Sequence, residues 1–85
     1  MNIKLNIKTV EGEEQEVLAI VPDFIAWERH SKRKISDLVN AIAMEDMAFL
    51  AHSSLKRQGN VKPFDAWIQT VAEIEMSDED PKATK

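Results

Sequence analysis

The sequence predicts an α+β fold, with an N-terminal two-stranded β-hairpin followed by three to four α-helices in one small domain over residues 1–76. Three observations favour this class. Polar and apolar residues alternate over the first ten positions, as in a strand with one buried face. Apolar residues recur at helical spacing in the second half of the chain. A length of 85 residues provides enough apolar surface for one core but not for two.

The hairpin is predicted over residues 2–21. Ile3, Leu5 and Ile7 alternate with Asn and Lys residues, which is the period of a half-buried strand. Gly12 supplies a turn residue that tolerates a positive φ, and a β-branched apolar run follows it. Because a two-stranded hairpin is only marginally stable in water, we expect the helices that follow to cover its apolar face.

Four helical segments are predicted, at about residues 23–31, 36–42, 44–58 and 63–75. Asp23 and Ser36 are the expected N-caps of the first two, because their side chains can accept from free amides in the first helical turn. The segment 44–58 carries the longest apolar stripe and is expected to be the central core helix. Pro63 suits the start of the last helix. Residues 77–85 have no large apolar side chain and are predicted to form a disordered acidic tail.

Composition excludes several classes of function. The chain has 11 Lys plus Arg against 15 Asp plus Glu, a net charge of −4, and no Cys. Without Cys there is no disulfide, no thiolate nucleophile and no thiolate-bound zinc or iron–sulfur cluster. The longest apolar run is too short for a membrane span or a signal sequence, so we expect a cytoplasmic protein with no membrane partner.

No pattern of reactive residues predicts an enzyme. His30 and His52 are too far apart in the sequence to form a metal-binding pair on one helix face, so no metal site is expected. Asp46, His52 and Ser53 contain the residue types of a catalytic triad, but adjacent helical residues point about 100° apart. The two glycines cannot build a phosphate-binding loop. We therefore expect no catalytic residues and no cofactor.

The run from Arg29 to Lys34 holds four cations and no carboxylate. It lacks apolar periodicity and is predicted to be a solvated loop. A basic run could meet phosphates, but the negative net charge and the absence of interleaved Tyr or Phe argue against a nucleic-acid partner.

Phe49 is the residue that most directly suggests a binding surface. It projects roughly 140° away from the apolar stripe of its helix and cannot share the same packing face. Either the hairpin or the last helix covers it, or it belongs to a docking patch. The tryptophans are most economically core residues with an edge that could contribute to such a patch. The predicted partner-binding residues are Met44, Met47, Phe49, Leu50, Trp27 and Trp67.

Several short motifs occur in a suggestive order. After the alternating segment come Asp23-Phe24-Ile25-Ala26-Trp27-Glu28, a helix ending in Leu55-Lys56-Arg57-Gln58-Gly59, Phe64-Asp65-Ala66-Trp67-Ile68 with Val71, and the acidic tail. In this order and spacing, over about residues 1–80, the chain resembles the small tail assembly chaperones of long-tailed (siphovirus-type) bacteriophages and prophages.

The resemblance implies a non-enzymatic protein made in the host bacterial cytoplasm. Such a chaperone coats the aggregation-prone tape measure protein, helps recruit tail tube subunits, and is absent from the mature virion. Self-association is left open. One alternative is a small structural head–tail connector or minor tail protein that stays in the particle. Another is a nucleic-acid-binding regulator that uses the basic run.

Overall fold

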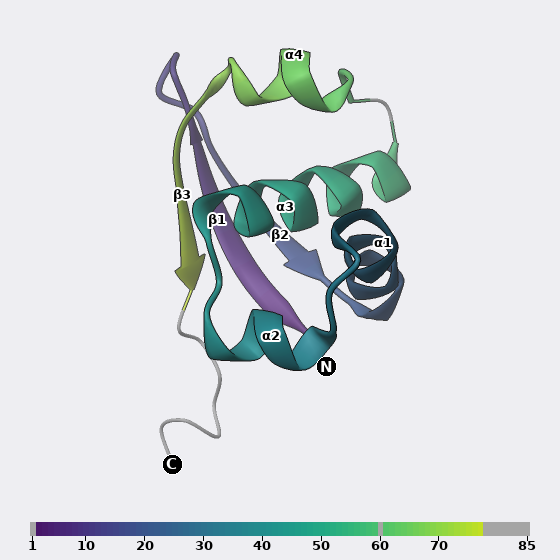
Figure 1. Cartoon of the computed structure of the whole chain (residues 1–85). Coiled ribbons are helices and arrows are strands. Elements are labelled where there is room, and N and C mark those ends of the chain that lie inside the picture. The colour runs from purple at the N-terminus through teal and green to yellow at the C-terminus, as the bar shows by residue number, and fades with distance from the viewer. Residues whose placement is uncertain (1, 60, 78–85) are drawn as a thin grey trace.

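The computed structural model describes residues 2–59 and 61–77, which form three β-strands and four α-helices (Figure 1). The α+β class and the N-terminal hairpin are confirmed. In chain order the elements are β1 (Ile3–Thr9), β2 (Glu14–Ala19), α1 (Val21–Ser31), α2 (Ile35–Asn40), α3 (Met44–Gln58), α4 (Phe64–Ile68) and β3 (Val71–Ser77).

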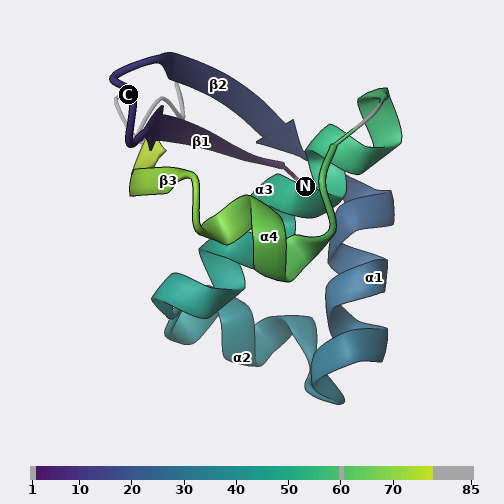
Figure 2. The same ribbon diagram turned by 90° about the horizontal axis from the view of Figure 1, so that it is seen from above.

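The three strands form one antiparallel sheet in the order β2-β1-β3. The hairpin turn is closed by a hydrogen bond from the Gly12 amide to the Thr9 carbonyl (2.9 Å), and Gly12 has the positive φ that the sequence indicated. In the central strand, Leu5 and Ile7 point to the side where the helices lie. All four helices are on that side of the sheet (Figure 2).

The prediction of one helix over residues 63–75 is wrong in its second half. The helix α4 ends at Ile68, and β3 then runs antiparallel to β1. Thr70 stops the helix, because both its amide (2.9 Å) and its hydroxyl (2.6 Å) donate to the carbonyl of Trp67. The sequence from Glu73 to Met76 alternates acidic and apolar residues, and this strand period fits the edge of β1 that the hairpin leaves unpaired.

Other predicted boundaries need smaller corrections. The segment predicted at 36–42 is the shorter helix α2, whereas α3 has the predicted bounds. The basic run 29–34 is not wholly a loop, since its first three residues complete α1. The predicted tail 77–85 begins one residue too early, because Ser77 still belongs to β3; its remainder lies outside the described residues.

Three helices begin with the same hydrogen-bond arrangement, which differs from the N-caps predicted at Asp23 and Ser36. Their N-cap residues, Ile20, Lys34 and Ala43, have no side chain that could accept a hydrogen bond. Instead, the carboxylate three residues later accepts from the N-cap amide, with distances of 2.9, 3.4 and 3.0 Å for Asp23, Asp37 and Asp46. Asp23 and Ser36 therefore lie inside their helices. A carboxylate at this position also interacts favourably with the positive end of the helix dipole.

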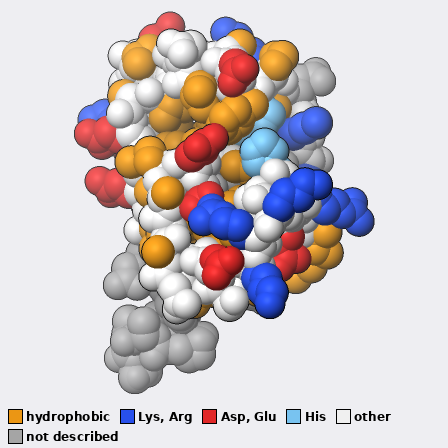
Figure 3. All heavy atoms as spheres, viewed as in Figure 1, with side chains coloured by type: hydrophobic (Ala, Val, Ile, Leu, Met, Phe, Trp, Pro, Cys, Tyr) orange, Lys and Arg blue, Asp and Glu red, His pale blue; other side chains and the backbone are white. Residues whose placement is uncertain are grey.

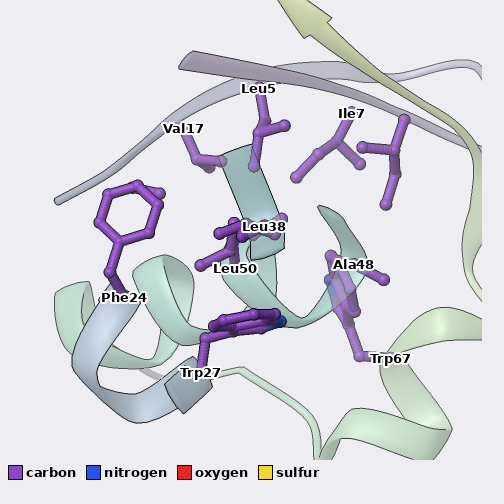
Figure 4. Packing of buried hydrophobic residues seen from close by; sticks show 12 residues of the cluster. Leu5, Ile7, Val17, Phe24, Trp27, Leu38, Ala48, Leu50 and Trp67 are labelled. Atoms are coloured by element: carbon purple, nitrogen blue, oxygen red, sulfur yellow. The ribbon is translucent and has the colours of Figure 1, made fainter. Parts of the chain in front are cut away.

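The core lies between the sheet and the helices (Figure 4). The side chains of Trp27 and Leu50 are completely buried in it. Its buried apolar members are Leu5, Ile7, Val17, Ala19, Phe24, Trp27, Leu38, Ala48, Leu50, Ala51, Trp67 and Ile74. Strand and helix residues are both represented, so burial of the hairpin depends on the helices as the sequence indicated.

Candidate protein-docking surface

The outer face of α3 carries Phe49. Leu50, Ala51 and Ser54 of the same helix are fully buried, and Ser54 donates to the Leu18 carbonyl of β2 (3.0 Å). Phe49 lies on another face of the helix and is half-buried. The central helix thus uses one face to complete the core and leaves an aromatic ring near the surface.

Five rings from three helices form what we call the aromatic group: His30, Phe49, His52, Phe64 and Trp67. His30 of α1 stacks on Phe49, with ring centroids 4.6 Å apart and planes inclined by 18°. Phe64 of α4 contacts Phe49 at 6.4 Å and His52 edge-on at 5.4 Å. Trp67 lies 5.4 Å from His52. These separations are typical of favourable aromatic pairs, so the group ties α1 and α4 to the outer side of α3.

Both histidines therefore make ring contacts within the aromatic group. The His52 ring donates from Nε2 to the carbonyl of Lys62 (2.7 Å), which positions the connection leading to α4. In residues 2–59 and 61–77, no three His, Asp or Glu side chains converge as a set of metal ligands.

A shallow hollow of about 170 Å³ opens beside the aromatic group. Ligand sites for small molecules usually enclose about 300–1,000 Å³, so this hollow is suited to one or two side chains of another polypeptide. Its lining comes from α1, the connection to α2, α3 and α4, and consists of Trp27, His30, Ser31, Arg33, Glu45, Asp46, Phe49 and Phe64. On the helix side of the molecule, apolar side chains gather over α3 and α4, with basic side chains beside and below them (Figure 3).

Asp46 fixes the inner wall of the hollow. Its carboxylate accepts from Trp27 Nε1 (2.9 Å), from Arg33 Nη2 (2.8 Å) and from the Ala43 amide (3.0 Å). The Arg33 guanidinium also lies 4.9 Å from the centroid of the Trp27 ring. Burial acts to raise the pKa of Asp46, but these hydrogen bonds and the charge of Arg33 together lower it below its usual value.

Asp23 joins α1 to α3 in a similar way. Its carboxylate is almost completely buried and accepts from Ser53 Oγ (2.7 Å), Arg57 Nη2 (2.8 Å) and the Ile20 amide (2.9 Å). Burial acts to raise the pKa of Asp23, but hydrogen bonds from Arg57, Ser53 and Ile20 and the charge of Arg57 outweigh it, so the pKa is lowered. The two carboxylates hold α1 against α3 and so keep the walls of the hollow in place.

The lowered pKa values of Asp23 and Asp46 predict how stability depends on pH. A carboxyl whose pKa is lower in the folded state stabilises the fold fully above its unfolded pKa, and this contribution is lost as pH falls through the folded pKa. We therefore expect the contribution of these two groups to be constant from about pH 7 to about pH 5 and to fall below about pH 4. Urea unfolding across this range measures it. The Asp46→Asn variant should show a shallower acid-side decline than the parent, and an equally steep decline would contradict the assignment.

The structure separates the six predicted partner-binding residues into two groups. Trp27, Leu50 and Trp67 are buried in the core, with exposed fractions of 0%, 0% and 7%. These three side chains belong to the core that lies beneath the surface. Met44 is 62% exposed at the first turn of α3, Met47 packs partly against the core, and Phe49 is half-buried. The sequence left two possibilities for Phe49, cover by another element or membership of a docking patch. In the structure, Phe64 of α4 covers part of the Phe49 ring, and a hollow lies beside the rest of it.

Sequence reasoning missed three residues of this surface. His30, Arg33 and Phe64 are not among the predicted partner-binding residues; His30 is considered only as a metal ligand, and Arg33 is predicted to lie in a solvated loop. The carboxylate three residues after the N-cap could have located the start of α1 and α2 correctly. No local signal predicts the stacking of His30 on Phe49, because the two residues come from different helices.

Comparison with known proteins does not assign the chain to a family. No family model matches the sequence, and neither the curated proteins nor the solved structures include a significant match. None of the described helices has the length and apolar character needed to cross a membrane.

Proposed function

We propose that this chain is a non-enzymatic tail assembly chaperone of a long-tailed phage or prophage. It binds the tape measure protein in the host cytoplasm, helps recruit tail tube subunits, and leaves before the virion is complete. The family resemblance of the sequence motifs is the origin of the proposal. The observation that carries it in the fold is the incompletely covered aromatic ring of Phe49 beside an open hollow.

The surface around Phe49 has the properties that a temporary protein contact needs. Aromatic rings supply apolar contact area with few rotatable bonds. The contact is shallow, so a bound segment gains modest affinity and can be displaced when tube subunits polymerise around the tape measure.

Co-expression with the tape measure protein encoded by the neighbouring gene tests the proposal. We expect the tape measure protein to stay in the soluble fraction when this chain is present and to aggregate when it is absent. Equal insolubility in both cases would contradict the proposed function.

Surface variants show whether the contact uses the proposed site. Phe49→Asp should reduce the soluble fraction of the tape measure protein, because a charge there opposes burial of an apolar segment. Phe49 is half-buried, so urea unfolding of the variant checks that its fold is kept. The matched control is Ile25→Asp, at a 43% exposed apolar position on α1 that does not line the hollow. A similar loss with the control would argue against this site.

The structural alternative predicts a different distribution of the protein. A head–tail connector or minor tail protein stays in the particle, whereas a chaperone does not. Mass spectrometry of purified virions distinguishes them, and we expect this chain to be absent. Stoichiometric presence would favour the structural role.

A further inference from the structure

The strand β3 forms the open edge of the sheet. In residues 2–59 and 61–77, its backbone has hydrogen-bond partners only in β1. The other outer strand, β2, is partly closed, because its Leu18 carbonyl accepts from Ser54 Oγ (3.0 Å) and from Arg57 Nη2 (3.3 Å) of α3. In Figure 1, β3 lies on the side of the sheet away from α1. It is therefore the edge at which a further strand can pair.

Two hydrogen bonds beside the hairpin turn show which residues of β1 face β3. The Thr9 amide donates to the Glu13 carbonyl, directly before β2 (2.8 Å). The Val10 amide donates to the Thr70 carbonyl, directly before β3 (2.9 Å). Backbone groups of successive strand residues point to opposite edges, so the even-numbered residues of β1 face β3 and the odd-numbered residues face β2.

The outward backbone groups of β3 belong to Ile74 and Met76. Glu73 and Glu75 are the ladder partners of even-numbered β1 residues, so their amides and carbonyls are used within the sheet. By the same alternation, the amides and carbonyls of Ile74 and Met76 point to the open edge, where no other described element pairs with them. A strand added at this edge gains main-chain hydrogen bonds to these groups.

The helix side of the open edge is incompletely covered at Met76. Met76 is the ladder partner of Leu5, and directly opposed residues lie on the same face of a sheet. Leu5 is completely buried under the helices, whereas Met76 is 47% exposed. The helix layer therefore does not extend over Met76, and an apolar side chain of an added strand can pack against it.

The other side of the same edge is acidic. Glu73 and Glu75 alternate with Ile74 and Met76, so their side chains lie on the face of the sheet away from the helices. Among the described residues, neither glutamate forms an ion pair. Both line a hollow of about 530 Å³ on this face, which has space for the ends of long side chains. Cross-strand pairs of opposite charge stabilise a sheet, so Lys or Arg is the favoured neighbour here.

We infer that β3 binds an extended segment of a partner protein in which Lys or Arg alternates with apolar residues. Main-chain hydrogen bonds to Ile74 and Met76 hold the segment as a fourth strand. Its basic side chains lie beside Glu73 and Glu75, and its apolar side chains cover Met76. This contact is separate from the surface around Phe49, so the inference goes beyond the proposed function and does not depend on it.

Three labelled peptides of about eight residues test the inference on the full chain. The first alternates Lys with Val, the second alternates Glu with Val, and the third has the composition of the first with all Lys before all Val. In low salt, we expect the alternating Lys peptide to bind at least about tenfold more tightly than either of the others. Added salt should reduce its lead over the Glu peptide.

Hydrogen exchange measured by NMR locates the contact on the backbone. In the free chain, the amides of Glu73 and Glu75 should exchange slowly and that of Met76 quickly. The alternating Lys peptide should slow exchange at Met76 and Ile74. Slow exchange at Met76 in the free chain would show that the edge is already paired and would overturn the inference.

A proline at position 76 removes one outward hydrogen-bond donor. Proline is tolerated on an edge strand where its missing N–H faces solvent, so Met76→Pro should keep the β1–β3 ladder. We expect it to weaken binding of the alternating Lys peptide by at least about tenfold. Met76→Ala keeps the amide and should weaken binding by only about threefold. Urea unfolding checks both folds, and equal affinity of Met76→Pro and the parent would contradict the pairing.

Two double variants with the same change in net charge test the role of the glutamates. Glu73→Gln with Glu75→Gln should weaken binding of the alternating Lys peptide by about fivefold. Glu14→Gln with Glu16→Gln makes the same change on β2, two strands away, and should weaken it by less than about twofold. Equal losses in the two variants would mean that net charge, not the β3 edge, attracts the peptide.

The remaining outcomes identify other occupants or no site at all. Equal affinity for the alternating and the rearranged Lys peptides would reject pairing as a strand. Self-association of the chain that Met76→Pro abolishes would identify a second copy as the occupant. Failure of these peptide experiments leaves the co-expression result with the tape measure protein unchanged. Conversely, a tape measure protein that stays insoluble rejects the proposed function and not the strand pairing at β3.

Discussion

Replacing Asp23 with Ala is expected to lower the free energy of unfolding by about 2 to 4 kcal/mol. Ser53 Oγ and the Ile20 amide lose their acceptor in a region that is largely closed to water, and α1 loses the carboxylate at its N-terminus. Arg57 is partly exposed and can turn to solvent, which keeps the cost below that of a fully buried ion pair. Urea unfolding followed by circular dichroism at about pH 7 measures the change.

The matched control for this prediction is Asp37→Ala. Asp37 occupies the same position in α2, but its hydrogen bond to the Lys34 amide is longer (3.4 Å), and its side chain is exposed with no ion pair among the described residues. We expect a cost below about 1 kcal/mol. Equal losses for Asp23 and Asp37 would mean that helix capping alone explains the effect and that the link between α1 and α3 adds little.

A disulfide between positions 6 and 75 is expected to form in the double variant Asn6→Cys with Glu75→Cys. Asn6 and Glu75 are direct partners in the β1–β3 ladder, and directly opposed residues bring their Cβ atoms to about 5 Å, near disulfide geometry. The natural chain has no Cys, so any crosslink comes from this pair. Because the bond closes most of the chain into one loop, the oxidised form should be about 2 to 4 kcal/mol more stable than the reduced form.

The register control for the crosslink is Lys8→Cys with Glu75→Cys. Lys8 pairs with Glu73, so Lys8 and Glu75 are diagonal neighbours about 7–8 Å apart, too far for a disulfide without backbone movement. Non-reducing electrophoresis and mass spectrometry compare the two variants after oxidation. Crosslinking in the control but not in the direct pair would contradict the register of β3, and no crosslinking in either would favour a continued helix over this segment.

Much of the fold could be predicted where a segment has one clear period. The alternation around Leu5 and Ile7 gave the first strand, and the apolar stripe with its C-terminal glycine gave α3 with correct ends. The segment after Trp67 failed because Ile68, Val71 and Ile74 continue a helical spacing while Glu73 to Met76 also alternate. The unpaired edge of β1 decides between the two, and that edge is a tertiary feature.

The candidate site was predictable only in part. Helical angles predict that Phe49 lies away from the core face of α3; in the structure it is half-buried and packs partly against the core. The core position predicted for Trp27 is confirmed, but helical angles could not show that Leu50 is completely buried, which depends on how other elements pack on α3. The sequence could not show the contribution of Arg33 either, because Arg33 lies in the connection before α2 and its partner Asp46 lies in α3.

The glutamates of β2 and β3 have a consequence for contacts between copies of this chain. These two strands form the outer borders of the sheet, and each carries a pair of acidic side chains, Glu14 with Glu16 and Glu73 with Glu75. Two copies that approached border to border would bring like charges together, and this repulsion opposes the strand-by-strand growth that leads to fibrils. The acidic strand borders therefore oppose edge-to-edge association of this chain at high concentration.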